Sequence, residues 1–238
     1  MTGVDECMAC QVILLGHTPD PDRIVAAAAR LCYSAVPASS IMEEQNSDSV
    51  VSLITHLRKS GHLSPLEHAS FTFSLDGISR VTSHQLVRHR IASYSQRSQR
   101  YVSMVEPDVV LPPTVAADKE ATDLFVHQVE SAHNTYLALL KRGVPKEDAR
   151  YILPHGWTTS LVMTMNAREL LHFFSLRLCR RAQWEIQELA RKMLIEVRQV
   201  SPVIFALAGP SCVVNGVCGE ARPCGKPFRS VEELLEEE

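Results

Sequence analysis

The chain has 238 residues, of which 45% are hydrophobic and 21% charged, and its formal net charge at pH 7 is −3. These values are typical of a globular protein with a substantial core. The slight acidic excess argues against a general nucleic-acid binder, which would be basic. No apolar run approaches the roughly 18 residues that a membrane span needs. The N-terminus is acidic and lacks the basic start of a secretory signal, so we expect a cytoplasmic protein without membrane association.

Apolar periodicity and turn residues predict the elements of the first ninety residues. In chain order we expect a strand over 11–17, helices over 21–35 and 47–62, a turn over 63–68, a strand over 69–75 and a helix over 78–90. Ser47 or Asp48 can cap the second helix, and Gly61 can end it. Asp76 and Gly77 predict a turn after the second strand.

The rest of the chain reads as longer helices and one further strand. We expect a proline-rich loop over 102–115, a helix over 117–142, a helix from Pro145, a strand over 155–165 and a helical segment over 166–200. Asn166 and Glu169 resemble a capping box at the start of that last segment. We therefore predict one α+β domain over 1–205, with a central, mostly antiparallel sheet packed with long helices. Residues 206–238, rich in Gly, Pro, Cys and acids, predict a mobile tail.

Seven cysteines are an odd number, and the chain is not small, so a secreted disulfide scaffold is excluded. Cys32 and Cys179 lie in apolar helical patterns and are expected to be buried thiols. The other five lie near the two ends of the chain: Cys7, Cys10, Cys212, Cys218 and Cys224. They could bind a metal if the termini met in space, but paired CxxC motifs at zinc spacing are absent, so we expect no metal site.

One segment is unusually cationic. Residues 77–105 contain no Asp or Glu, but they hold Arg80, His84, Arg88, His89, Arg90, Arg97 and Arg100. Cations this dense repel one another and need a counter-charge, since a solvated face would carry interleaved acids. Arginine grips phosphate with two parallel hydrogen bonds, and Gln85, Gln96 and Gln99 offer amides that can read a base edge. The segment therefore favours a site for a nucleotide or another phosphorylated ligand.

Two other interpretations of the cationic segment stay open from these residues alone. It could be an exposed basic loop that pairs with acids elsewhere in the chain. It could also bind single-stranded nucleic acid, but such a groove needs stacking aromatic rings, and Tyr94 and Tyr101 are the aromatics of this segment. We therefore expect no nucleic-acid partner.

Five segments resemble the flavin-dependent thymidylate synthases. Arg88-His89-Arg90, seven further residues and Ser98 match the signature of that family. The other four segments also occur in the family's order: HLSPLEHASFTF (62–73), ARYILPHG (149–156), NARELLHFFSLR (166–177) and AQWEIQ (182–187). One such motif could arise by chance, but five in order are highly specific.

The resemblance implies an enzyme of nucleotide biosynthesis, a methyltransferase that reductively methylates dUMP to dTMP. By this resemblance, 5,10-methylenetetrahydrofolate donates the carbon and leaves as tetrahydrofolate, and NADPH reduces a bound FAD that delivers the hydride. Members of the family are homotetramers whose active sites are shared between subunits, so the same assembly is expected here. The phosphates of dUMP and FAD and the carboxylates of the folate would neutralise the cationic segment.

The resemblance also implies residue roles. Arg177 is the expected catalytic residue, because a cation beside the uracil ring stabilises the negative charge that develops on N3 and O4. Arg100 and Arg150 would grip the phosphate of dUMP. The complete expected dUMP site is Gln85, Leu86, Val87, Arg88, Gln96, Arg97, Ser98, Gln99, Arg100, Arg150 and Arg177.

The expected flavin site lies partly on the same segment and partly on the helix that Asn166 opens. Its residues are Ser64, Arg88, His89, Arg90, Gln96, Asn166, Arg168 and His172. Arg168 and His172 share a helix face, whereas Arg177 would face the other way on a straight helix. The two arginines should therefore serve different ligands, unless the helix bends. The chain has no Gly-rich phosphate loop, so we expect a non-Rossmann flavin site.

Two positions depart from the family pattern: Gln96 stands where Glu is frequent, and His172 where Asn is frequent. Both side chains still form hydrogen bonds, so altered contacts are expected rather than lost activity. None of the cysteines has a credible catalytic setting, and Ser98 has no visible base. We therefore expect the flavin to carry the chemistry while the protein orients the reactants.

Two hypotheses compete with this enzyme. A nucleotide or RNA sensor could use the same arginines without chemistry, and it would be colourless and strongly salt-dependent in binding. A flavoprotein of another reaction class, such as an oxidase, would be yellow but indifferent to dUMP. The ordered motifs favour the thymidylate synthase.

Overall fold

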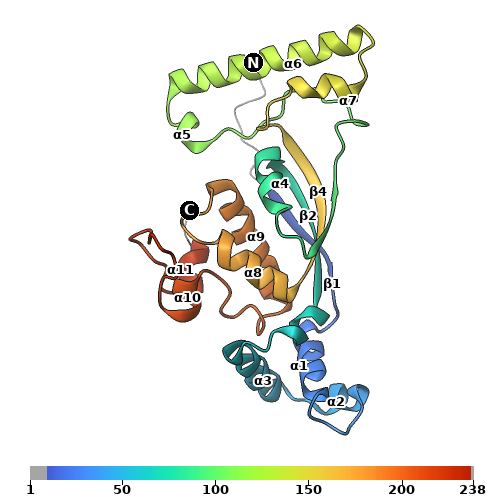
Figure 1. Cartoon of the computed structure of the whole chain (residues 1–238), viewed down its shortest axis with the longest axis vertical. Helices are drawn as coiled ribbons and strands as arrows, with labels where there is room; N and C mark the ends of the chain where they lie inside the picture. The colour runs from blue at the N-terminus through green and yellow to red at the C-terminus, as the bar shows by residue number, and fades with distance from the viewer. Residues whose placement is uncertain (1–9, 237–238) are drawn as a thin grey trace. The chain divides into compact units, whose positions relative to one another are not determined.

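The computed structural model describes residues 10–236. They form one mixed α/β domain with a four-stranded antiparallel sheet in the order β1-β2-β4-β3 (Figure 1). The strands are β1 (Gln11–His17), β2 (Ser70–Ser79), β3 (Ala92–Gln96) and β4 (Thr158–Asn166). The hydroxyls of Thr72 and Thr164 lie 2.9 Å apart and mark the register of β2 against β4. The predicted α+β class and antiparallel sheet are confirmed.

The domain divides into two compact units. Unit 1 contains residues 10–11, 75–88 and 95–162, and unit 2 contains residues 12–74, 89–94 and 163–236. The boundary falls within each strand and also between Arg88 and His89. The Arg-His-Arg motif therefore contributes residues to both units.

Unit 1 is built around one long helix. Its elements are α4 (Arg80–Leu86), α5 (Pro113–Ala116), α6 (Lys119–Lys141), α7 (Lys146–Ala149) and the 3-10 turn η2 (Arg150–Ile152). The carboxylate of Asp118 caps α6 by accepting from the backbone N–H groups of Glu120 and Ala121. Helices α6 and α7 lie side by side (Figure 1) over a core that includes Tyr136 and Trp157.

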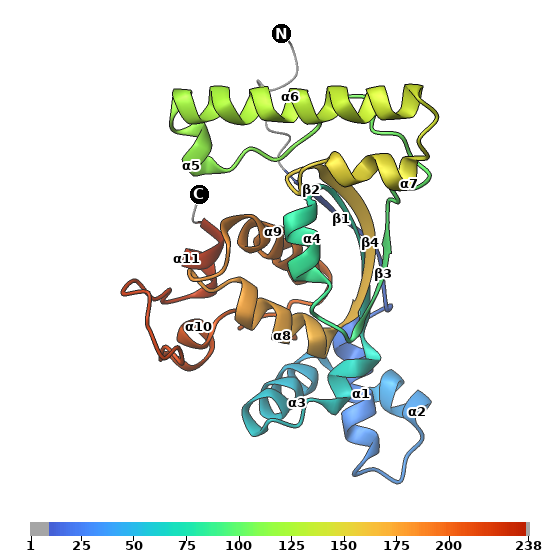
Figure 2. The same ribbon diagram turned by 45° about the horizontal axis from the view of Figure 1, so that its top comes forward.

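Unit 2 contains the remaining helices. They are α1 (Pro21–Leu31), α2 (Ala38–Glu44), α3 (Ser47–Ser60), the 3-10 turn η1 (Ser64–His68), α8 (Ala167–Arg177), α9 (Trp184–Val200), α10 (Ser211–Asn215) and α11 (Val231–Glu236). Helices α8 and α9 pack together (Figure 2). The core of the unit includes Phe205, whose ring meets those of Phe71 and Phe174 edge-on, with ring centres 5.4 and 5.9 Å apart. Such edge-on pairs match the positive rim of one ring to the negative face of another.

The buried face of β2 is as predicted, but several local details differ from the prediction. Phe71, Phe73 and Leu75 are buried on one face of β2. The strand continues through Asp76 and Gly77, where a turn was expected, because Gly77 adopts a φ of 72° inside it.

Three helical predictions were also imprecise. The side chain of Asn46, rather than Ser47 or Asp48, caps α3 by accepting from the backbone N–H of Ser49. The segment over 166–200 forms two helices, because α8 ends at Arg177 and α9 begins at Trp184. Cys32 is exposed, since it lies just past the last residue of α1, and Cys179 is partly exposed.

The C-terminal segment is packed, although the sequence predicted a mobile tail. Phe228, Val231 and Leu234 are buried. The guanidinium of Arg180 lies over the ring of Phe228, 3.9 Å from its centre, which is a cation–π contact. These apolar residues anchor the end of the segment, whereas the loop over 214–227 is largely exposed. Within residues 10–236, no helix is both long and apolar enough to span a bilayer.

Gly61 provides a test of the backbone argument. It ends α3 with a φ of 74°, and an added Cβ would meet nothing within 4 Å. Gly61→Ala should therefore lower the free energy of unfolding by about 1 kcal/mol through backbone strain alone. Gly16→Ala is the matched control, because that site is equally open and has no left-handed φ. Urea unfolding of both variants checks the difference, and equal stabilities would contradict it.

Candidate functional site

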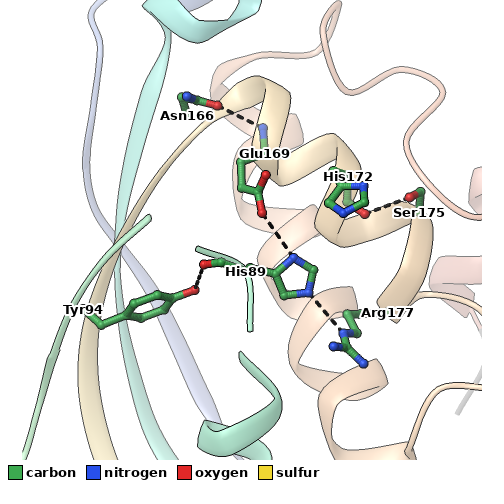
Figure 3. A network of polar contacts seen from close by, with 7 residues as sticks. All are labelled: His89, Tyr94, Asn166, Glu169, His172, Ser175 and Arg177. Carbon is green, nitrogen blue, oxygen red and sulfur yellow. Dashed lines mark hydrogen bonds and ion pairs between the residues drawn. The ribbon is translucent and has the colours of Figure 1, made fainter. Parts of the chain in front are cut away.

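His89 is the centre of a polar network in unit 2 (Figure 3). Its ring is buried and contacts Phe173 edge-on, with ring centres 5.0 Å apart. Nδ1 lies 3.3 Å from Oε1 of Glu169, and Nε2 accepts a hydrogen bond from Nε of Arg177 at 3.2 Å. The backbone carbonyl of His89 accepts a 2.8 Å hydrogen bond from the hydroxyl of Tyr94. The middle residue of the Arg-His-Arg motif is thus held on three sides.

The contacts of His89 define its protonation state. Nε–H of Arg177 can only donate, so Nε2 must be the unprotonated nitrogen and Nδ1 must carry the proton toward Glu169. Burial, followed by the nearby Arg177 and His172, lowers the pKa of His89 to about 4. The imidazole is therefore neutral at pH 7, and its contact with Glu169 is a hydrogen bond rather than an ion pair.

Glu169 is the acidic member of this network. It lies in the first turn of α8 and is 7% exposed. Burial raises the pKa of its carboxyl, while His172 and Arg168 act in the opposite direction. Burial and the neighbouring Glu169 also raise the pKa of the Tyr94 hydroxyl, which keeps that group a hydrogen-bond donor. The Tyr94 hydroxyl therefore keeps its proton over a wide pH range.

The other residues of unit 2 that were predicted to bind flavin lie at the start of α8 and along it, in η1 and in the Arg-His-Arg motif. The side chain of Asn166 accepts from the backbone N–H of Glu169 at 2.9 Å, which confirms the predicted cap. Arg168 pairs with Glu67 of η1, and both side chains are about half exposed. The exposed ring of His172 lies edge-on to His89, with ring centres 5.8 Å apart. Ser64 and Arg90 are exposed. Arg168 contacts Glu67 and Arg177 contacts His89, and their assignment to different ligands stays a prediction.

Unit 1 holds a separate group of cations around α4 and η2. Burial, followed by the charge of Arg150, lowers the pKa of Arg80. Burial, His155, Arg80 and Arg88 together lower the pKa of His84, whose ring centre lies 5.3 Å from that of His155. Nη1 of Arg80 is buried and has no hydrogen-bond partner. A buried guanidinium nitrogen without an acceptor is costly, so this cluster fits an anion.

The two residues that were predicted to bind phosphate, Arg100 and Arg150, both contact Glu147 of α7. Nε of Arg100 lies 3.0 Å from the carboxylate of Glu147, and Nε of Arg150 donates to the backbone carbonyl of the same residue at 3.1 Å. The Arg100–Glu147 pair is about half exposed, so it contributes at most about 1 kcal/mol and a phosphate can compete with it. The structure thus brings Arg100 and Arg150 together, as a shared ligand requires.

The other predicted nucleotide residues of unit 1 lie on α4 and at the end of β3. The side chain of Gln96 donates to the hydroxyl of Thr159 at 3.2 Å, and Nε2 of the buried Gln99 has no partner. The backbone N–H of Arg97 bonds to Ser160, and the Ser98 hydroxyl accepts from the N–H of Arg100. Gln85 and Leu86 belong to α4, Val87 caps its end, and Leu86 is fully buried. Leu86 therefore packs the core with its side chain.

Sequence reasoning missed several residues of these clusters, including Arg80, Tyr94 and Glu169. Arg80 was counted among the cations of the segment but received no role, although its place at the start of a helix beside other cations was a usable signal. Tyr94 and Glu169 also received no role in binding. Glu169 was recognised as part of a cap, and a buried acid facing a histidine from a distant segment cannot be read from spacing.

The low pKa of His89 has a consequence for stability. Between about pH 4, its folded pKa, and about 6.5, its ordinary pKa, the unfolded chain binds the extra proton. The free energy of unfolding should therefore fall as the pH is lowered through this window, by at most about 1.4 kcal/mol per pH unit. The raised pKa of Glu169 gives a contribution of opposite sign, so wild type should be compared with His89→Asn. Denaturant unfolding at several pH values measures the difference, and identical pH slopes in the two proteins would refute it.

Comparisons with known proteins identify the family. A family model described as thymidylate synthase complementing protein matches residues 13–203. A flavin-dependent thymidylate synthase of Geobacter sulfurreducens is 49% identical over 219 residues, covering 91% of this chain and 94% of the relative. One from Clostridium tetani is 43% identical over 236 residues, covering 92% of this chain and 94% of the relative.

A solved structure agrees with these relatives. The crystal structure of a UMP/dUMP methylase, PolB from Streptomyces cacaoi, bound with 5-Br dUMP, superimposes with a TM-score of 0.75 at 28% identity. The match covers 83% of this chain and 93% of that one. The matching family model, the relatives of nearly equal length and the shared fold all lead to one conclusion: this chain is an enzyme of the flavin-dependent thymidylate synthase family.

Proposed function

We propose that the protein converts dUMP to dTMP, with 5,10-methylenetetrahydrofolate as carbon donor, NADPH as reductant and FAD as the bound cofactor. The released products are tetrahydrofolate and NADP⁺. The observation that carries the proposal is the Arg-His-Arg motif in a member of this family, with Arg177 hydrogen-bonded to the neutral His89 at its centre. The motif combines the buried contact of His89 with two arginines, Arg88 and Arg90, that are exposed and available to anionic ligands.

The phosphate of dUMP is proposed to bind the cations of unit 1. Arg80 and Arg150 influence each other electrostatically, and Arg100 and Arg150 both contact Glu147. A phosphate dianion between these guanidinium groups would supply the acceptor that Nη1 of Arg80 lacks. A bound phosphate would thus explain both the positive charge of the acid-free segment and the missing acceptor at Nη1 of Arg80.

The pyrimidine base requires a different kind of contact, namely directional hydrogen bonds. We assign this role to Gln85, Gln96 and Gln99, whose amides can both donate and accept. Nε2 of Gln99 is buried without a partner, so a carbonyl oxygen of the ligand would satisfy it. Arg88, Arg97, Ser98 and the backbone of Leu86 and Val87 complete the proposed site.

The residues of unit 2 fit the flavin. Arg90 and Arg168 supply positive charge for a diphosphate, and the positive end of the α8 dipole lies beside Asn166. His172 and Ser64 add exposed polar groups, and Arg88, His89 and Gln96 complete the proposed set. Once bound, the flavin supplies the hydride chemistry. The protein's part is to bind, orient and keep the charges of the ligands compensated.

Arg177 is proposed to act on the uracil ring. Its Nε donates to Nε2 of His89, and this hydrogen bond fixes the plane of the guanidinium. Negative charge that develops on N3 and O4 of the base would be stabilised by this fixed cation. Because the imidazole of His89 is neutral, it orients Arg177 without adding a second charge.

The family resemblance also supports an assembly and a location. We propose a homotetramer with active sites shared between subunits, in the cytoplasm, acting on small molecules rather than on nucleic acid or membranes. The acid-free segment carries more cations than one small ligand needs, which is compatible with several ligands at a shared site.

An absorption spectrum followed by a product assay tests the function. The purified protein should show a flavin band near about 450 nm that bleaches with NADPH under anaerobic conditions. Addition of dUMP and methylenetetrahydrofolate should then give dTMP. A protein that stays colourless when supplied with FAD would favour a nucleotide sensor, and a yellow protein indifferent to dUMP would favour another flavoenzyme class. Either result would overturn the proposal.

Arg177→Ala separates flavin binding from catalysis. The variant should retain its flavin, because the proposed flavin contacts lie elsewhere on α8 and on the Arg-His-Arg motif. It should lose dTMP formation by roughly 100-fold or more, since a preorganised charge is removed. Flavin content and single-turnover dTMP formation measure the two effects, and full activity would exclude the assigned role.

Arg80→Gln tests the phosphate subsite. Loss of a charged hydrogen bond of about 1.5–3 kcal/mol should weaken dUMP binding roughly 10–100-fold. Deoxyuridine, which has no phosphate, should bind wild type and variant equally. Arg142→Gln removes the same charge from an exposed position at the end of α6 and is the matched control. Calorimetric titration compares the three proteins, and an equal loss for deoxyuridine would contradict a phosphate contact.

A further inference from the structure

Four cysteines, one just after α8 and three within the C-terminal segment, line one cavity in unit 2. Cys179 follows α8, Cys212 belongs to α10, and Cys218 and Cys224 lie in the loop between α10 and α11. All four line a cavity of about 230 Å³. Burial raises the pKa of Cys179, a hydrogen bond with the backbone of Arg181 opposes this, and Glu220, Cys224 and Cys212 add to the rise, so the last two thiols lie within electrostatic reach of Cys179.

The arrangement is neither a disulfide nor a site for a single ion. The four cysteines are free thiols. Within residues 10–236, no three His, Cys, Asp or Glu side chains lie close enough together to hold one metal ion. A zinc ion binds sulfur at about 2.3 Å, so its four thiolates would stand only roughly 4 Å apart. The four thiols line one cavity but are not gathered closely enough for a single ion.

Thiolates that surround a wider space are suited to a metal cluster. In an iron–sulfur cluster each cysteine binds a different iron at the outside of the core, so the four sulfurs stand further apart than around a single ion. Soft thiolate ligands select this kind of centre over hard cations such as Mg²⁺ or Ca²⁺. The cavity that the four thiols help to line has a volume of about 230 Å³, which offers room for such a core.

The surrounding charges and backbone fit the same occupant. Four thiolates give the cluster a net negative charge, and Arg180 and Lys226 line the cavity together with the single acid Glu220. The loop over 216–230 contains three glycines and two prolines and forms no helix or strand. A loop of this kind buries few apolar side chains, so ligand bonds are an effective way to order it.

We propose that Cys179, Cys212, Cys218 and Cys224 bind an iron–sulfur cluster of the [4Fe–4S] type. The centre would join the end of α8 to the C-terminal loop. It lies outside the nucleotide and flavin residues proposed above and does not depend on their roles. Cys224 is exposed, so oxygen can reach the cluster, and it should be lost in air.

The test begins with wild-type protein purified without oxygen. It should contain about four iron and four acid-labile sulfide per chain. Mössbauer spectroscopy of protein from cells grown on enriched iron identifies the cluster without interference, because flavin contains no iron. Zinc in place of iron, a disulfide among these cysteines, or protein free of both iron and sulfide after anaerobic reconstitution would each overturn the proposal.

Variants then locate the cluster. Cys212→Ser and Cys218→Ser should each reduce iron and sulfide several-fold and should speed proteolytic cleavage in the loop over 216–230. Cys32→Ser is the matched control, because Cys32 is an exposed free thiol on α1's end that does not line the cavity. Flavin content shows whether a variant has folded. Iron that survives in both cavity variants, or is lost equally in the control, would exclude these ligands.

Discussion

The neutral imidazole of His89 is the constraint on which the site depends. The buried ring of His89 accepts a hydrogen bond from Arg177 and donates one to Glu169. The backbone carbonyl of His89 accepts a third from the hydroxyl of Tyr94. If the ring were protonated, it could no longer accept from the guanidinium, and two cations would face each other in a poorly solvated place. The low pKa of His89 is therefore a condition for placing Arg177. The central residue of the motif acts through its hydrogen bonds rather than through charge.

A second constraint concerns the cations of the acid-free segment, residues 77–105. Around α4 and η2, burial and then neighbouring cations lower the pKa of Arg80 and of His84, and one nitrogen of Arg80 has no acceptor. A protein retains such strain where a ligand relieves it, since anions then bind more tightly than they would to a compensated surface. The same segment supplies the buried, neutral His89 and the charged arginines, so one stretch of sequence serves two chemically different tasks.

Much of this architecture could be predicted because it rests on local signals. The apolar alternation of β2, the long amphipathic α6 and the cap at Asn166 all depend on residues close in sequence. The order of the family motifs predicted the enzyme class. The roles of individual site residues were predicted only by resemblance and stay proposals.

The missed features depend on tertiary contacts. Glu169 approaches His89 from a distant segment, and Cys179 shares a cavity with three cysteines of the C-terminal segment. The missing acceptor at Nη1 of Arg80 likewise depends on the tertiary structure around it. The packing of the C-terminal segment was also missed, because composition indicated mobility while a few residues such as Phe228 anchor it. β3 was missed because its sequence, ASYSQ, consists mostly of small and polar residues and shows no apolar alternation.

The most direct test of this account is the ¹⁵N NMR spectrum of the ring nitrogens of His89 in the flavin-bound enzyme, assigned with His89→Asn. At pH 7 the account predicts a neutral ring with its proton on Nδ1, and no titration until the pH approaches about 4. A ring that carries protons on both nitrogens at pH 7, or one whose proton sits on Nε2, would contradict it, because such a ring cannot accept from Arg177.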